Sequence, residues 1–178
     1  MDYVYLKEFL ADYSLPTLVI ALVVTAVSIL LDKLSGNKLS MLFKTYLPFV
    51  LSIILNFIYD SALVSKQLSF RTDTFYAGLL SGSLSALITG LICKIKRGEP
   101  LSASATAVII ESIICGYVDE KILAKVALAI EKLYLEDQQF SEKKTAEIIK
   151  KHSNGQLSDQ ECESLSKLIA EAVNAVGR

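Results

Sequence analysis

The stretch that decides the fold is Asp73 to Lys94, DTFYAGLLSGSLSALITGLICK, which holds twenty uncharged residues between two charged ones. A helix needs about twenty apolar residues to cross a hydrocarbon core roughly 30 Å thick. Inside this run a small residue recurs at every fourth position, at Gly78, Gly82, Ala86 and Gly90. Positions four apart lie close together on one helix face, so these residues form a stripe. Glycine is common in membrane helices generally, but a regular stripe favours close helix packing or assembly.

Two further candidate spans precede this one, at residues 14–31 and 45–65, and the central span itself covers residues 74–93. Pro16 suits the first turn of a helix. Asp60 falls near the end of the second span, where a carboxylate would lie at the membrane interface. Its alternative role is in a polar path through the membrane.

Residues 101–118, LSASATAVIIESIICGYV, form a fourth apolar run that carries Glu111 near its middle. A carboxylate at that depth costs about 2.5–3.5 kcal/mol on insertion scales. The run is therefore either a fourth span, with Glu111 facing a bundle interior or a pore, or a helix at the inner surface. A buried helix of a soluble domain is a third interpretation, which the neighbouring spans make weaker.

From Asp119 onward the pattern becomes that of soluble amphipathic helices, because Ile122, Val126, Ile130 and Leu133 recur at spacings of three and four. A second helix is expected to open at Ser141 and to close at Asn154 and Gly155. Ser158 and Glu161 have the spacing of a capping box before the last helix.

We therefore expect an all-α polytopic membrane protein, with three or four transmembrane helices in residues 1–118 and a soluble helical tail in residues 119–178. The first and third loops hold more Lys and Arg than the other exposed segments, which places these two loops in the cytoplasm. The tail is then cytoplasmic with three spans and outside with four. Candidate contacts to lipid headgroups are Lys94, Lys96 and Arg97 in the third loop. The tail lysines Lys143, Lys144, Lys150 and Lys151 form a solvated face, or alternatively contact anionic headgroups if the tail is cytoplasmic.

No residue pattern here points to catalysis. His152 is the only histidine, and the three cysteines have no metal-ligand spacing. A net charge of −1 gives no reason to expect nucleic acid as a partner. We expect no cofactor, no metal and no enzyme activity, and we expect membrane lipid and further copies of the chain as partners.

Four segments of the tail resemble the soluble tail of a class of phage holins known from Gram-positive systems. They are VALAIEK (126–132), SEKKTAEII (141–149), LSDQE (157–161) and LIAEAVNAV (168–176). In addition, KRGEPLSASATAVIIESIICG (96–116) resembles the basic loop and following helix of multi-span holins.

The resemblance implies a protein that oligomerises in a bacterial cytoplasmic membrane and opens lesions that release a peptidoglycan-degrading lysin. Gly78, Gly82, Ala86 and Gly90 would then form the assembly surface, and Glu111 would line the lesion. One alternative is a constitutive oligomeric channel or transporter subunit with Glu111 or Asp60 on its path. Another is a membrane-anchored interaction module that recruits a soluble partner through residues 119–178. The small-residue stripe meets either a helix of its own chain or a second copy.

Overall fold

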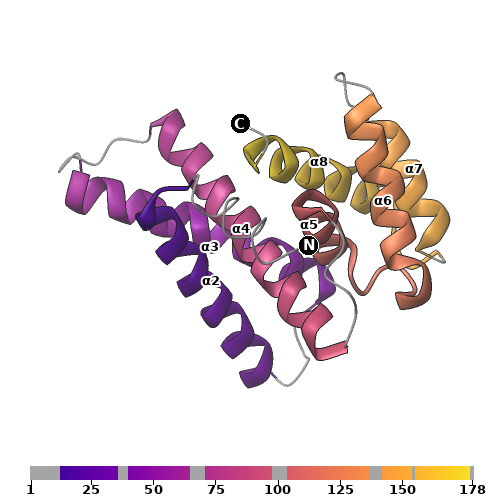
Figure 1. Ribbon diagram of the computed structural model, residues 1–178, viewed down its shortest axis with the longest axis horizontal. Helices are drawn as coiled ribbons and strands as arrows, with labels where there is room; N and C mark the ends of the chain where they lie inside the picture. Colours follow the sequence, from indigo (N-terminus) through magenta and orange to yellow (C-terminus); the bar gives the residue numbers. More distant parts are fainter. Residues whose placement is uncertain are drawn as a thin grey trace. The chain divides into compact units, whose positions relative to one another are not determined.

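The computed structural model describes residues 13–35, 40–64, 71–97, 104–136, 142–153 and 155–176, and throughout these ranges the regular structure is helical (Figure 1). The helices are α2 (Leu15–Leu34), α3 (Met41–Tyr59), the π-helical turn η1 (Asp60–Val64), α4 (Thr72–Arg97), α5 (Ala105–Ile114), α6 (Glu120–Glu136), α7 (Glu142–His152) and α8 (Asp159–Val176). This confirms the all-α prediction. The chain divides into two compact units, Met1–Ser102 and Ala103–Arg178, which are described separately below.

The first unit holds three helices that are long and apolar enough to cross a membrane, at Leu15–Leu34, Met41–Leu63 and Thr72–Lys96. Pro16 lies in the first turn of α2, where a missing N–H costs nothing. Pro48 lies inside α3, which nevertheless continues to Tyr59 and into η1. The three spans predicted from the uncharged runs are therefore present as helices, with ends displaced by a few residues.

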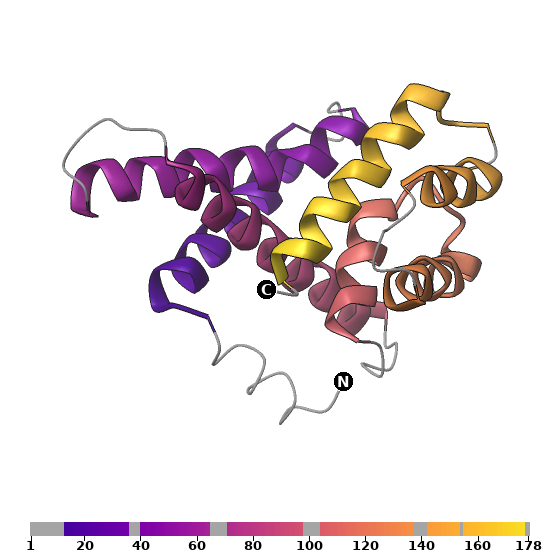
Figure 2. The same ribbon diagram turned by 90° about the horizontal axis from the view of Figure 1, so that it is seen from above.

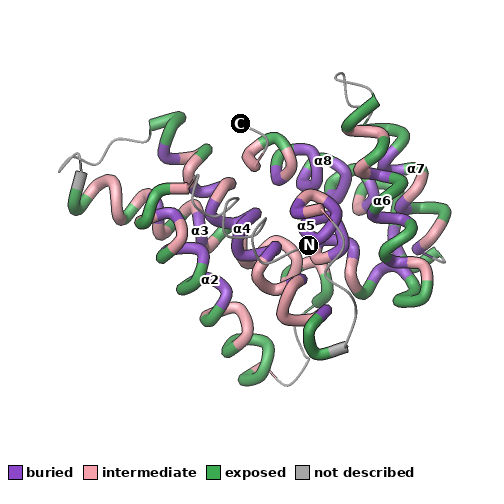
Figure 3. Tube along the Cα trace, viewed as in Figure 1, coloured by how far each residue is buried: buried purple, intermediate pink, exposed green. Residues whose placement is uncertain are grey.

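Large apolar side chains cover the outer faces of these helices. The exposed side chains include Leu22, Val23 and Leu30 on α2, and Val50, Ile54 and Ile58 on α3. Figure 3 shows these exposed turns in green along α2 and α3. An apolar surface of this extent is unfavourable in water and is the surface that a lipid environment requires.

The fourth apolar run forms a much shorter helix than a span. α5 covers ten residues, and at 1.5 Å per residue it is about 15 Å long, half of a hydrocarbon core. The Ser104 hydroxyl caps its start by accepting a hydrogen bond from the backbone N–H of Ala107 at 3.0 Å. Its end is set by a turn in which Cys115 leaves the helical conformation and Gly116 has a φ of 92°, a left-handed conformation that favours glycine. The Tyr117 N–H donates to the Ile114 carbonyl at 3.1 Å and closes this turn. Residues 101–118 are thus interrupted, and α5 is not continuous with the helix that follows.

α5 belongs to the second unit, so the boundary between the units lies after Ser102 and not after Val118. It contacts α6 and α8, α7 contacts both α6 and α8, and Figure 1 and Figure 2 show α6 and α7 side by side. The core of this unit is formed by fully buried aliphatic side chains, namely Ile109, Ile110, Ile113, Ile114, Ile130, Ile149, Leu165 and Ile169. In the structure, α5 is a buried helix of the C-terminal domain. This was the interpretation of residues 101–118 that the neighbouring spans made weaker.

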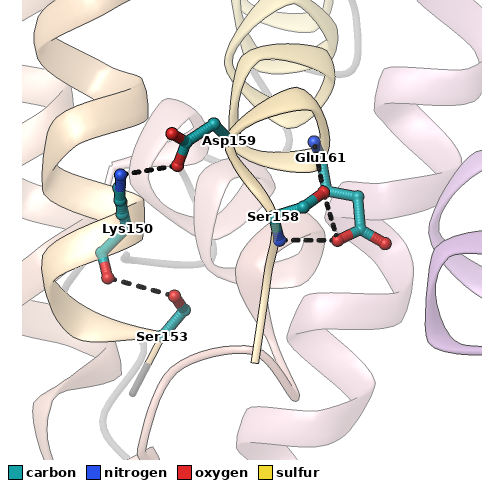
Figure 4. A network of polar contacts seen from close by, with 5 residues as sticks. All are labelled: Lys150, Ser153, Ser158, Asp159 and Glu161. Atoms are coloured by element: carbon teal, nitrogen blue, oxygen red, sulfur yellow. Dashed lines mark hydrogen bonds and ion pairs between the residues drawn. The ribbon is translucent and has the colours of Figure 1, made fainter. Parts of the chain in front are cut away.

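The joint between α7 and α8 matches the sequence pattern (Figure 4). α7 ends at His152, with Gly155 at a φ of 73°, as expected for a glycine after a helix end. The predicted capping box is present: the Ser158 N–H donates to Glu161 Oε2 at 2.7 Å, and the Glu161 N–H donates to Ser158 Oγ at 3.3 Å. Lys150 Nζ lies 2.6 Å from Asp159 Oδ1, which ties the two helices together. The predicted N-cap of α7, Ser141, lies outside the described residues.

Two pKa shifts follow from this joint. Hydrogen bonds from the Ser158 backbone and hydroxyl lower the pKa of the Glu161 carboxyl. The hydrogen bond to Asp159, followed by its charge, raises the pKa of the Lys150 ammonium. The contribution of Glu161 to stability is thus present above the ordinary pKa of a glutamate and is lost as the pH falls through the lower pKa of the folded state. The contribution of Lys150 is present below the ordinary pKa of a lysine and is lost as the pH rises through the higher pKa of the folded state.

Replacing Ser158 with alanine should raise the pKa of Glu161 and lower the stability of the C-terminal unit by about 1 kcal/mol, as for other N-cap losses. The carboxyl ¹³C shift of Glu161, followed by NMR across the acid range, measures the first effect, and thermal unfolding measures the second. Ser164→Ala is the control, because Ser164 is an exposed serine inside the same helix that bonds only the Gln160 carbonyl. Equal behaviour of the two alanine variants would contradict a capping role.

Candidate functional site

The glycine face of α4 is filled by α3 of the same chain. A Cβ atom added to Gly78 would lie 2.7 Å from Ile53 Cα, and one added to Gly82 would lie 3.0 Å from Phe49 Cα. Real Cβ atoms essentially never come as close to a backbone atom as 2.7 Å, so position 78 requires glycine at this helix separation, and position 82 is tighter than nearly all real Cβ contacts. The two helices therefore approach backbone to backbone, which is how small residues promote helix association in lipid.

Two neutral hydrogen bonds link α4 to its neighbours inside the bundle. Asn56 Nδ2 of α3 donates to Ser81 Oγ at 3.1 Å, and Asn56 is buried. On the other side, Thr25 Oγ1 of α2 and Ser85 Oγ lie 2.9 Å apart, and both residues are buried. Such contacts between membrane helices are worth on the order of 0.6 kcal/mol each, because the same polar groups also find partners when the helices are separated in the membrane. α4 is thus bonded to α2 and α3 by separate serines.

Charged residues in the described parts of α2, α3 and α4 lie near the helix ends. Lys44 Nζ is 2.5 Å from Asp32 Oδ1, which joins the end of α2 to the start of α3. Thr74 Oγ1 donates to Asp60 Oδ2 at 3.3 Å, which joins the end of α3 to the start of α4. Asp60, half-buried at the end of its span, is therefore at a helix junction, as the interface interpretation expects. In the described middle parts of the three spans, away from Asp60 and Lys94 near the ends, the polar side chains are neutral hydroxyls and the Asn56 amide.

The remaining predicted site residues fall in different places. Ala86 and Gly90 are buried on α4, along with the two glycines that meet α3. Glu111 is 6% exposed and belongs to α5 of the C-terminal unit, so it is not part of any of the three spans. Of the basic residues at the end of α4, Lys94 is buried and Lys96 is exposed, while the side chain of Arg97 lies outside what the structure describes.

The polar residues that connect the helices were not predicted from the sequence. Asn56 is the only amide in its uncharged run, and Ser81, Ser83 and Ser85 alternate in the middle of α4. A buried amide or hydroxyl in lipid needs a partner, so an isolated Asn within an apolar run is the signal that would have indicated a cross-helix bond. The sequence does not reveal which serine it meets.

Within the described residues, no group of three or more His, Cys, Asp or Glu side chains lies close enough to hold a metal ion. The three cysteines are free thiols. Comparisons of the chain with protein-family models, with curated proteins and with solved structures found no match.

Replacing Gly78 with leucine should lower the free energy of unfolding of the detergent-solubilised protein by about 1–3 kcal/mol or more, because the side chain must displace the backbone of α3. Thermal unfolding in detergent measures the loss. Ala26→Leu is the matched control, since Ala26 is exposed on α2 and has room for the same side chain. A Gly78→Leu protein as stable as the Ala26→Leu protein would contradict the close approach of α3 and α4.

Proposed function

We propose that the protein is a membrane-anchored interaction module, in which α2, α3 and α4 form the anchor and residues 103–178 form the domain that binds a partner protein. The observation that carries this proposal is the occupation of the glycine face by α3 of the same chain. A bundle whose close-packing surface is satisfied internally does not need a second copy to complete it, and such a bundle suits an anchor.

The C-terminal unit supports the second half of the proposal. Its aliphatic core is fully buried, and its helices carry their own caps and ion pairs at the α7–α8 joint. An unstructured tail would show neither a common core nor reciprocal caps. A folded domain of this kind offers a fixed surface for a partner.

The number of spans decides on which side the domain lies. With three crossings, the domain emerges on the same side as the loop between α2 and α3. That loop is flanked by Lys33 and Lys44, and α4 ends with Lys94 and Lys96. Basic residues favour the cytoplasmic side, so we place the domain in the cytoplasm.

A second candidate function is holin-like permeabilisation of a bacterial cytoplasmic membrane. The observation in its favour is the set of buried hydroxyls on α4 and its partner helix, at Ser81, Ser83, Ser85 and Thr25. If the helices re-paired between copies, these hydroxyls would supply a neutral, wettable lining for a lesion. The tail segments that resemble those of phage holins support the same proposal.

Induced expression in a bacterium, followed with a membrane-potential dye, separates the two candidates. The anchor proposal predicts a steady membrane potential and continued growth, because the bundle stays closed. A photocrosslinking residue at Glu163, exposed on α8, should form a discrete adduct with a protein, and the same residue at lipid-facing Ala26 should not. A sudden collapse of the potential after a delay would contradict the anchor proposal and support permeabilisation. A steady, ion-selective conductance would contradict both.

A further inference from the structure

The outer face of α6 carries a stripe of basic and apolar residues. Its members follow one another at spacings of four and three, so they lie along one line of the helix: Lys121, Lys125, Leu128, Lys132 and Leu135. All five are exposed, with Leu128 at 49% and Leu135 at 79% of their full accessibility. The opposite face of α6 is buried in the domain core, so this stripe, the α6 stripe, is the face that the domain leaves uncovered (Figure 3).

The charge of the α6 stripe differs from that of the domain around it. Residues 103–178 contain twelve acidic and nine basic residues, so the domain as a whole is acidic. The stripe has three lysines; Lys132 pairs with the adjacent Glu136 at 3.4 Å, so Lys121 and Lys125 carry most of its net positive charge. A positive face with two large apolar side chains on an acidic domain is complementary to a negatively charged surface that also accepts hydrocarbon.

The connection between the anchor and the domain is short. α4 ends at Arg97 and α5 begins at Ala105, so seven residues connect the anchor to the domain. Seven residues span at most about 25 Å even when fully extended. A short tether gives the domain a high effective concentration at the bilayer surface, so weak contacts are sufficient for docking.

We propose that the α6 stripe docks on the anionic headgroups of the membrane in which the chain is anchored. Leu128 and Leu135 enter the boundary between headgroups and acyl chains, and the three lysines contact lipid phosphates. An anionic bilayer supplies negative charge and hydrocarbon together along the whole length of the stripe. The proposal rests on the membrane anchoring proposed above and adds a lipid-composition dependence to it.

The test uses the full chain, one copy per nanodisc, in phosphatidylcholine alone or in phosphatidylcholine with phosphatidylglycerol. Backbone hydrogen exchange of residues 121–135 is measured by mass spectrometry in both lipids. Docking predicts exchange in α6 slower by roughly tenfold in the anionic discs, with the difference lost at high salt. Equal exchange of α6 in both lipids would overturn the proposal. Exchange that is equally slow in both would further indicate that protein, and not lipid, covers the face.

The stripe itself is tested by the triple variant K121E/K125E/K132E, which should lose the lipid-dependent protection. The matched control is K143E/K151E/K167E, which changes the net charge equally through exposed lysines of α7 and α8 and should keep it. The variant K121R/K125R/K132R should keep the lipid-dependent protection as well, and L128Q/L135Q should weaken this protection.

Loss of the lipid-dependent protection in both K121E/K125E/K132E and K143E/K151E/K167E would overturn the proposal. The net charge of the domain, and not the α6 stripe, would then account for the protection. Circular dichroism in neutral discs shows whether each variant is folded. Incorporation into the discs reports anchoring separately, so a protein that inserts normally but shows no lipid-dependent protection contradicts the docking and leaves the anchor intact.

Discussion

The structure depends on the close approach of α4 to α3 at Gly78 and Gly82. Each of these glycines has the backbone of α3 where a side chain would begin. In lipid the hydrophobic effect does not hold helices together, so dispersion contacts between closely packed backbones must do so. The regularly spaced small residues of α4 thus pack against a helix of the same chain. The outer faces of α2 and α3 stay exposed and can contact lipid.

The hydrogen bonds from Ser81 and Ser85 add direction to this packing. One serine bonds Asn56 of α3 and the other bonds Thr25 of α2, so α4 is held from two sides. These groups are neutral, whereas the charged residues of the described spans lie near the helix ends. This distribution suits a closed bundle, and it is the reason for preferring an anchor over a conducting path. The lytic alternative requires the same hydroxyls to leave these partners and face water.

How much could be predicted from the sequence differs between the two units. The spans followed from uncharged runs of sufficient length, and the cap at Ser158 and Glu161 followed from spacing alone, because both are local properties. Residues 101–118 were more difficult, since hydropathy cannot show that Gly116 takes a left-handed conformation and ends α5 after ten residues. The partner of the glycine stripe and the serine that meets Asn56 depend on how helices far apart in sequence pack, which periodicity does not determine.

The close packing of α3 against α4 within one chain can be measured with a disulfide between Ile53→Cys and Gly78→Cys, with the native cysteines replaced by alanine. A Cβ at position 78 would lie 3.2 Å from that of Ile53, slightly less than the roughly 3.5–4.5 Å between the Cβ atoms of a disulfide, so the bond forms once the two helices move apart by a few tenths of an ångström. Gly78→Cys paired with Ile54→Cys is the control, because Ile54 is exposed on the outer face of α3. The account predicts rapid oxidation of the first pair to a cross-linked monomer and little reaction of the control. Dimers from the first pair without a cross-linked monomer would contradict it.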